Sequence, residues 1–315
     1  MVEIILFEGV LESEYKETYF LINKLGTGAT SQVFKGVNNK NKIVSVKVYQ
    51  NENSIDHFSR EVESLDEIKH KNIIKMLDHG KGILKTNSSQ NSQQINYIIL
   101  EYACYGDLFE LIRSARKGFG EELGAIIFKS VLDGLEACYD SGYYHGDLKT
   151  ENILIDGNFE IKISDFGFSN KYEHDTMVYS QIGTDGYYAP EVYNCHTNGF
   201  DPLMNDIFAV GVMLFIIVAG KIPFCDPKIS DKNYKFIIKQ NLKGFWKKQS
   251  RSVKLSDSFK DLFSKLVDFK AENRITIRSI KKHPWLVSRL IGGSREKELF
   301  EDIKNRQKIN LYKIK

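Results

Sequence analysis

Arginine and cysteine are both scarce in this chain of 315 residues. Only nine of the 44 basic side chains are Arg, the residue that binds phosphates and base edges in a bidentate way. With 41 acidic residues the net charge is +3, which excludes a protein whose main task is to coat nucleic acid or anionic lipid. The four Cys are too far apart for a CxxC zinc site and suggest no disulfide framework. This cysteine usage predicts a reducing, intracellular compartment.

Long apolar runs are also missing. The longest, residues 207–220, has 14 residues and falls short of the roughly 20 that a membrane-spanning helix needs, so we expect a buried core helix. The first ten residues lack the basic region of a signal peptide. The composition, 42% hydrophobic and 27% charged, is typical of a globular protein, and the length fits two domains or one domain of two lobes. We expect a soluble cytoplasmic protein with no membrane span and no nucleic-acid partner.

The pattern of apolar residues changes from strand-like to helical near residue 107. A helix is expected over residues 55–68, with Ser54 or Asn53 as its N-cap. The polar residues 81–96 are expected to form a flexible surface loop between two strands. Apolar runs enriched in Val, Ile, Tyr and Phe predict strands at 2–7, 19–22, 43–48 and 97–100, and two short strands at 153–155 and 161–163. The pattern therefore predicts an α+β protein with a small β-rich unit followed by a larger, mainly helical unit.

Two motifs in the first unit have residues suited to binding phosphates. The glycines of residues 25–33 would let the backbone approach a phosphate closely, although a plain Gly-rich turn is as good an interpretation of that string alone. A dinucleotide-binding fold is not favoured, because β-branched residues follow the glycines where that fold has a helix. Lys47 lies in an apolar strand and is either solvated or directed at phosphates, in which case Glu61 or Glu63 would be its partner.

The strongest motif spans residues 144–152 and 163–167. It places Asp147, Asn152 and Asp165 between short apolar segments, and these supply the oxygen ligands that Mg²⁺ prefers together with a candidate base. Lys149 adds a cation two residues from Asp147, which suits the stabilisation of a phosphoryl group in transfer. The alternative interpretation is an acidic turn joining two strands.

Taken together, the motifs resemble those of the eukaryotic protein kinase domain, over residues 19–286 or so. Five signatures occur in the family's order: Gly26-x-Gly28-x-x-Ser31-x-Val33, Val44-Ser45-Val46-Lys47, His145-Gly146-Asp147-Leu148-x-x-x-Asn152, Asp165-Phe166-Gly167 and Ala189-Pro190-Glu191. The resemblance implies a bilobal fold with a small antiparallel β N-lobe, one main helix in that lobe, and a larger helical C-lobe. It divides the chain into an N-terminal extension at 1–18, an N-lobe at 19–101, a hinge at 101–106, a C-lobe at 107–286 and a charged tail at 287–315.

The resemblance also implies roles for single residues in a transfer of the γ-phosphoryl group of ATP. Asp147 would accept the proton of the substrate hydroxyl, and Lys149 would contact the γ-phosphate. Lys47 would hold the α- and β-phosphates and pair with Glu61, which the family's spacing favours over Glu63. The metal ligands for Mg²⁺ would be Asn152 and Asp165. The remaining ATP-binding positions would be Gly26, Gly28, Ser31, Val33, Glu101, Ala103 and Asp107.

Other positions resemble structural residues of the family and indicate its Ser/Thr type. Asp206 matches the residue that braces the catalytic loop, and Arg274 matches the partner of Glu191. Lys149 and the segment at 183–191 resemble the Ser/Thr pattern, and residues 283–285 resemble the domain end of the calcium/calmodulin-dependent-like kinases. The expected partners are protein substrates with Ser or Thr acceptors. Asp107 and Glu151 would favour basic residues near the acceptor, unless they are ordinary solvated carboxylates.

Three departures from the family and the tail leave alternatives open. Gly146 stands where most members have an Arg that binds a phosphate in the activation segment, so we expect activity without that phosphate. Ser31 replaces the third Gly, and Thr150 replaces a Pro. The tail is expected to be a frayed surface helix, with an amphipathic helix folded back on the C-lobe or a calmodulin-type target as alternatives. A pseudokinase acting as a binding module and a small-molecule kinase are the competing functions.

Overall fold

The computed structural model describes residues 8–49, 54–86, 92–250, 253–291 and 295–314, and the chain divides into two compact units. The first unit consists of residues 1–69 and 73–104, and the second of residues 70–72 and 105–315. An antiparallel sheet with a helix, followed by a mainly helical part, confirms the predicted α+β kinase-like fold.

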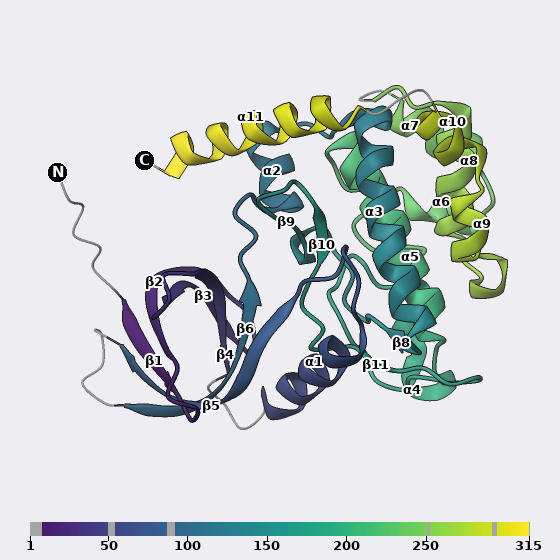
Figure 1. The fold of residues 1–315 in the computed structure, drawn as a ribbon. Helices are drawn as coiled ribbons and strands as arrows, with labels where there is room; N and C mark the ends of the chain where they lie inside the picture. The colour runs from purple at the N-terminus through teal and green to yellow at the C-terminus, as the bar shows by residue number, and fades with distance from the viewer. Residues whose placement is uncertain (1–7, 50–53, 87–91, 251–252, 292–294, 315) are drawn as a thin grey trace. The chain divides into compact units, whose positions relative to one another are not determined.

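Six antiparallel strands form a closed barrel in the first unit (Figure 1). Val46, Tyr97 and Ile99 point into its apolar interior and are almost completely buried. Alternation of side chains along each strand explains why residues two apart share this core. The order around the barrel is β1 (Gly9–Ser13), β2 (Thr18–Thr27), β3 (Gln32–Asn38), β4 (Ile43–Tyr49), β6 (Gln93–Glu101) and β5 (Met76–Thr86).

Strand β1 closes the barrel because it pairs on both of its edges. Gly9 lies opposite Leu21 of β2 and also opposite Thr86 of β5. The predicted loop at 81–96 is therefore wrong, since its first six residues continue β5 and residues 93–96 begin β6. Each of these polar segments contributes one apolar side chain to the core, Leu84 from β5 and Ile95 from β6. The polar composition of the segments does not reveal these two buried positions. The strand predicted at 2–7 and the centre of the predicted loop, 87–91, lie outside the described residues.

The predicted helix of the first unit is α1, Ile55–Glu67, and it contacts β5 and β6. Ser54 occupies its N-cap position without a side-chain capping hydrogen bond, and Asn53 lies outside the described residues. Glu61 is completely buried on the inner face of this helix, whereas Glu63 is exposed. The choice of Glu61 as the candidate partner of Lys47 thus agrees with the direction in which the helix faces.

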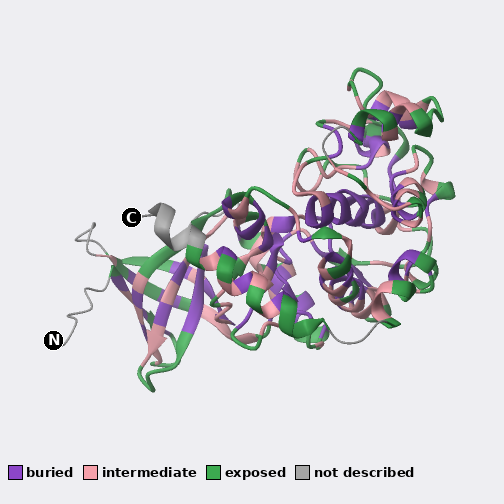
Figure 2. Ribbon diagram, turned by 90° about the horizontal axis from the view of Figure 1, so that it is seen from above, coloured by how far each residue is buried: buried purple, intermediate pink, exposed green. Residues whose placement is uncertain are grey.

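Helices α3 (Gly120–Asp140) and α5 (Pro202–Ala219) pack together at the centre of the second unit. Nearly every residue of α5 is buried (Figure 2). Asp201 caps its N-terminus by accepting from the backbone N–H groups of Leu203 and Met204. Among the described residues α5 has the length and composition of a membrane-crossing helix, but 83% of that window is buried inside the protein. Such burial is that of a core helix, as the sequence predicted.

Short strands and further helices complete the second unit. The two strands predicted near 153–155 and 161–163 are confirmed as β9 (Ile153–Ile155) and β10 (Ile161–Ile163), which form a sheet with β7 (Gly106–Asp107). The other elements are α2 (Leu108–Ala115), β8 (Tyr143–Tyr144), β11 (Asn170–Lys171), α4 (Cys195–Asn198), α6 (Tyr234–Ile238), α7 (Leu242–Gln249), α8 (Asp257–Leu266), α9 (Ile277–Lys281), α10 (Pro284–Ile291), α11 (Glu296–Ile314) and single 3-10 turns at Thr150–Asn152, Pro190–Asn194 and Ala271–Asn273.

Helix α11 folds back on α2, so the expectation of a frayed surface helix is wrong and the amphipathic alternative holds. Leu299 and Ile303 of this helix are buried. The Arg306 guanidinium is also buried, donates 2.8 Å hydrogen bonds to the carbonyl oxygens of Lys117 and Gly118, and lies 3.8 Å from the centre of the Phe119 ring. These contacts tie α11 to the loop that follows α2 and satisfy two of its backbone carbonyl oxygens.

Candidate active site

Lys47 and Glu61 form a buried ion pair within the first unit. The Lys47 ammonium donates to Glu61 Oε2 at 2.5 Å, and the exposed fractions of the two residues are 5% and 0%. The interpretation of Lys47 as an ordinary solvated lysine is therefore wrong. A buried charge needs a charged partner, so each member of the pair holds the other in its place.

The glycine-containing segment runs from the end of β2, which holds Gly26, through the turn that joins β2 to β3. The Gly28 N–H donates to the Ser31 carbonyl oxygen at 2.8 Å and closes the turn. A Cβ atom at Gly26 would meet no other atom within 4 Å, so the backbone there is open to an incoming group. The strand–turn–strand arrangement agrees with the predicted context, and Val33 follows in β3. Glu101 ends β6, and Ala103 follows it within the first unit.

Asp107 begins helix α2 in the second unit. Its carboxylate is the N-cap and accepts from the Glu110 N–H at 2.8 Å. Burial raises the pKa of Asp107 to about 6 against the opposing effect of that hydrogen bond, and the negative charges of Glu110 and Glu151 act in the same direction as burial. Asp107 is therefore not an ordinary solvated carboxylate.

Asp206 fixes the loop that follows β8. One carboxylate oxygen accepts from the His145 N–H at 2.8 Å and the other from the Gly146 N–H at 3.0 Å. Burial raises the pKa of Asp206 to about 7, although both N–H donors favour its charged form. Gly146 has a φ of +79°, and a Cβ there would lie 2.8 Å from the Phe168 carbonyl oxygen, so this loop conformation suits glycine.

His145 connects the loop to the segment before Asp165. Its Nε2 lies 3.1 Å from the Ser164 carbonyl oxygen, and its Nδ1 accepts from the Asp147 N–H at 3.2 Å. An Nδ1 that accepts assigns the ring proton to Nε2 in the neutral ring. Burial lowers the pKa of His145, which keeps the ring in that neutral form. The imidazole is thus a fixed spacer between the two acidic segments.

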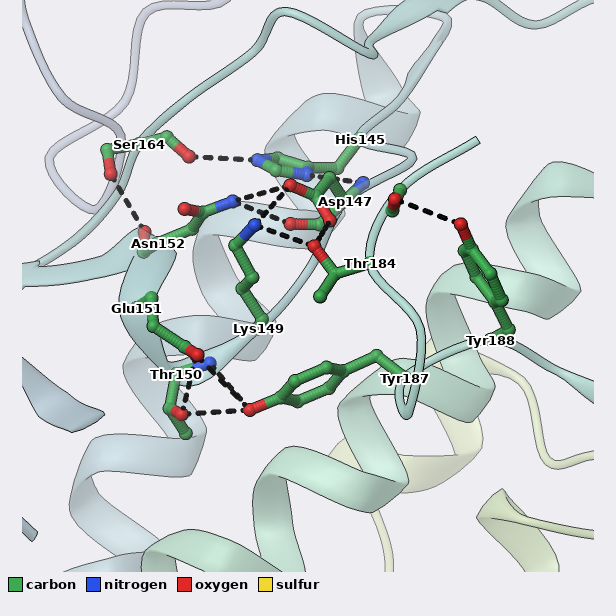
Figure 3. A network of polar contacts seen from close by, with 11 residues as sticks. His145, Asp147, Lys149, Thr150, Glu151, Asn152, Ser164, Thr184, Tyr187 and Tyr188 are labelled. Carbon is green, nitrogen blue, oxygen red and sulfur yellow. Dashed lines mark hydrogen bonds and ion pairs between the residues drawn. The ribbon is translucent and has the colours of Figure 1, made fainter. Parts of the chain in front are cut away.

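Asp147 lies at the centre of a polar network (Figure 3). Its Oδ2 accepts from the Lys149 ammonium at 2.7 Å, and its Oδ1 accepts from the Thr184 hydroxyl at 2.7 Å. Lys149 also donates to the Thr184 oxygen at 2.7 Å, and the Asn152 amide donates to the Asp147 carbonyl at 2.7 Å. Thr184 was missed as a functional residue, although it follows the glycine of the 183–191 segment that already indicated the Ser/Thr pattern. The network orients the Asp147 carboxylate from both sides.

Ser164, the residue before Asp165, is hydrogen-bonded to Asn152. The Asn152 carbonyl oxygen accepts from both the N–H and the hydroxyl of Ser164, at 2.9 and 3.0 Å. Asp165 has a φ of +64°, and the Phe166 ring behind it packs edge-on against the His145 ring. No group of three or more His, Cys, Asp or Glu suited to a metal occurs in the described part of the chain. An amide and a carboxylate oxygen still fit Mg²⁺, which keeps several waters and takes further oxygens from phosphates.

Two contacts hold the segment that carries Thr184. Arg274 forms a bidentate ion pair with Glu191, with N–O distances of 2.6 and 2.7 Å, and the Arg274 side chain is fully buried. The Tyr187 hydroxyl lies 2.9 Å from the Thr150 hydroxyl and 3.3 Å from Glu151. Thr150, at the position where the family usually has Pro, therefore takes part in a side-chain network (Figure 3).

Comparison with known proteins identifies similar sequences over most of the chain. A family model described as the protein kinase domain matches residues 19–286. CBL-interacting protein kinase 10 of Oryza sativa subsp. japonica is 32% identical over 270 residues, covering 83% of this chain and 55% of that protein. Serine/threonine-protein kinase SRK2B of Arabidopsis thaliana is 32% identical over 279 residues, covering 87% of this chain and 73% of that protein. The chain spans about half the length of the several CBL-interacting relatives that it matches.

Proposed function

The chain belongs to the protein kinase family, and on this basis we propose that it transfers the γ-phosphoryl group of ATP to Ser and Thr hydroxyls of proteins. The observation that carries the proposal is the orientation of the Asp147 carboxylate. It accepts 2.7 Å hydrogen bonds from the Lys149 ammonium on one oxygen and from the Thr184 hydroxyl on the other. Phosphoryl transfer needs little covalent chemistry from the protein, so catalysis rests on positioning and electrostatics. The arrangement around Asp147 supplies both.

In this proposal Asp147 accepts the proton of the incoming hydroxyl and orients its oxygen toward the phosphorus. Lys149 bonds one Asp147 oxygen and neutralises negative charge that develops during transfer. The Thr184 hydroxyl bonds both the Asp147 carboxylate and the Lys149 ammonium, so it fixes the position of the base relative to the cation. A general base in this position contributes roughly 10²- to 10⁴-fold to the rate.

A protein kinase domain implies ATP and a divalent metal ion. We propose Lys47, held by Glu61, as the ligand of the α- and β-phosphates. The phosphate-covering segment would consist of Gly26 at the end of β2, Gly28 and Ser31 in the turn, and Val33 in β3. Glu101, Ala103 and Asp107 would complete the nucleotide site. Asn152 and Asp165 would bind Mg²⁺, which neutralises phosphate charge when bound. The oxygen chemistry of the last two residues supports this assignment.

The substrate and regulatory assignments are finer proposals. Lys149 in the catalytic loop supports Ser/Thr acceptors, and the carboxylates of Asp107 and Glu151 support a preference for basic residues near the acceptor. The tail offers little to a calmodulin-like regulator, because Leu299 and Ile303 are already buried. The names of several relatives state that they interact with CBL, so a CBL-type regulator is a proposal for this chain, tested by adding such a protein to the transfer assay.

The domain limits and the location are also proposals. We place the catalytic domain at 19–286, with residues 1–18 as an extension and 287–315 as a tail; pairing of β1 and packing of α11 support including both flanks in any fragment that is to fold. A cytoplasmic location is supported by the four cysteines, all within the described residues and none in a disulfide. Fractionation of cells expressing a tagged chain tests it.

The test of the proposed function is phosphate transfer from labelled ATP with Mg²⁺ to a generic basic protein, followed by phosphoamino-acid analysis. Label on Ser or Thr that disappears when EDTA removes the metal supports the proposal. Label on Tyr would overturn the Ser/Thr assignment. Binding of ATP without any transfer would favour a pseudokinase, and absence of both would contradict the assigned nucleotide site.

A further inference from the structure

Tyr49 and Lys47 donate hydrogen bonds to the same carboxylate, that of Glu61. Its hydroxyl donates to Glu61 Oε2 at 2.5 Å, and this is the same oxygen that accepts from Lys47 at 2.5 Å. Tyr49 is two residues after Lys47 in β4, so both side chains leave the same face of the strand. Tyr49 is 2% exposed, and the three polar groups thus meet in a buried environment.

A second contact joins Tyr49 to the same helix. The Tyr49 ring packs edge-on against the Phe58 ring, with centres 5.5 Å apart and planes at 70°. Phe58 and Glu61 are three residues apart and therefore share one face of α1. The strand side of the contact is rigid, because β4 pairs with β3 on one edge and with β6 on the other. Tyr49 thus holds two points of α1, about one turn apart, against a fixed strand.

Hydrogen bonds to a charged group inside a protein are stronger than neutral ones, and a buried carboxylate that loses a donor is costly to keep charged. Lys47 alone could release Glu61 if the helix moved outward. The phenol adds a second donor from a side chain that the barrel holds in place, and this lowers the population of states in which α1 has moved.

We propose that Tyr49 is a positioning residue that latches α1 so that Glu61 stays paired with Lys47. The inference rests on the proposed function, in which this pair holds the ATP phosphates. Gly146 has no side chain that could bind a phosphate in the activation segment. The Tyr49 contact would hold α1 in place without that phosphate. Removal of the phenol hydroxyl should therefore raise the KM for ATP and leave the KM for the peptide substrate unchanged.

The test compares Tyr49→Phe with the matched control Tyr97→Phe. Both tyrosines are buried on barrel strands, and each substitution removes one hydroxyl that donates to a carboxylate. The Tyr97 hydroxyl donates to Asp78 at 3.1 Å. For Y49F we expect the KM for ATP to rise roughly tenfold with an unchanged KM for peptide, because only a fraction of molecules keeps Lys47 in place. For Y97F we expect both KM values to stay within about twofold of the unsubstituted chain. Equal effects of the two substitutions would show a merely structural role and overturn the proposal.

Amide hydrogen exchange of α1 tests the latch without any need for catalysis. Exchange in this helix should speed up roughly tenfold in Y49F and stay unchanged in Y97F. If the unsubstituted chain transfers no phosphate but Y49F loosens α1, the proposed function fails and the latch stands. If the chain is active and α1 exchange is unchanged in Y49F, the latch fails alone. Should Y49F not fold, Phe58→Leu, which removes the ring contact and retains the hydroxyl, must also speed α1 exchange; unchanged exchange there contradicts the latch.

Discussion

The Thr184 hydroxyl donates a 2.7 Å hydrogen bond to Asp147 across 37 residues of chain. The same hydroxyl oxygen accepts from Lys149 at 2.7 Å, so one uncharged side chain connects the candidate base with the candidate cation. The orientation of the Asp147 carboxylate therefore depends on the segment at 183–191, which the Arg274–Glu191 ion pair anchors from its other end.

Replacement of Thr184 by Val should lower kcat roughly 10- to 100-fold, the loss expected for one hydrogen bond to a charged group. The volume of the side chain is kept, so the KM for ATP should change little. Steady-state kinetics with a peptide substrate check this prediction. Thr184→Ser is the matched control, because it retains the hydroxyl and should retain most of the activity. A Thr184→Val enzyme with normal kcat would contradict the role assigned to the network.

Asp107 should make the stability of the protein depend on pH between about 4 and 6. Burial raises its pKa from the ordinary value of 3.8 to about 6 in the folded state, so its contribution is fully present below 3.8 and is lost as pH rises through 6. Asn caps helices as well as Asp does and cannot ionise. The free energy of unfolding of the unsubstituted chain should therefore fall relative to Asp107→Asn as pH rises from 4 to 7, by on the order of 1–3 kcal/mol. Urea unfolding at a series of pH values measures the difference, and a difference that is constant with pH would contradict the assigned pKa.

Helix α11 should stabilise the second unit through Arg306. Arg306→Met leaves the Lys117 and Gly118 carbonyl oxygens without their buried donor, so we expect the free energy of unfolding to fall by about 2–4 kcal/mol. Lys297 is exposed on the same helix, and Lys297→Met should change stability by less than about 0.5 kcal/mol. Denaturant unfolding of both variants tests the prediction. Equal effects would mean that the tail is frayed in solution.

Phosphorylation of the segment after residue 170 should not be needed for activity. Thr176 and Ser180 are candidate acceptors, but Gly146 offers no cation at the position where most of the family binds the phosphate. The double variant Thr176→Ala, Ser180→Ala should keep its phosphate-transfer rate within about threefold, a difference of about 0.65 kcal/mol. A loss of 50-fold or more, measured on protein that mass spectrometry shows to be unphosphorylated, would contradict this expectation.

The sequence predicted those features whose residues lie close together in the chain. The alternation in β4 and the apolar spacing of α1 suggested that Lys47 could meet Glu61 or Glu63, and the family's spacing selected Glu61. The pairs that span longer distances, such as Asp206 with His145, came only through the family resemblance, since no local pattern indicates them. The order of the motifs also implied the two-unit α+β fold, which the structure confirms.

Other features could not be predicted, because contacts with distant parts of the chain determine them and the local composition indicates a different structure. Residues 81–86 are polar enough to be read as a loop, yet pairing with β1 on one edge and β6 on the other makes them a strand. Charge in the tail suggested solvent exposure, but the Arg306 guanidinium is buried and donates to the Lys117 and Gly118 carbonyl oxygens, a contact that no sequence pattern shows. No sequence pattern indicated a role for Tyr49 either, because its partner Glu61 lies on a different element.

The most direct test of the account is the rate of phosphate transfer by Asp147→Asn, measured beside its affinity for ATP in the presence of Mg²⁺. Asparagine keeps the shape of the side chain but cannot accept the proton of the substrate hydroxyl. We predict a loss of at least about 100-fold in kcat with ATP affinity within about threefold of the unsubstituted chain. An Asp147→Asn protein that binds ATP and transfers phosphate at the normal rate would show that Asp147 is not the base.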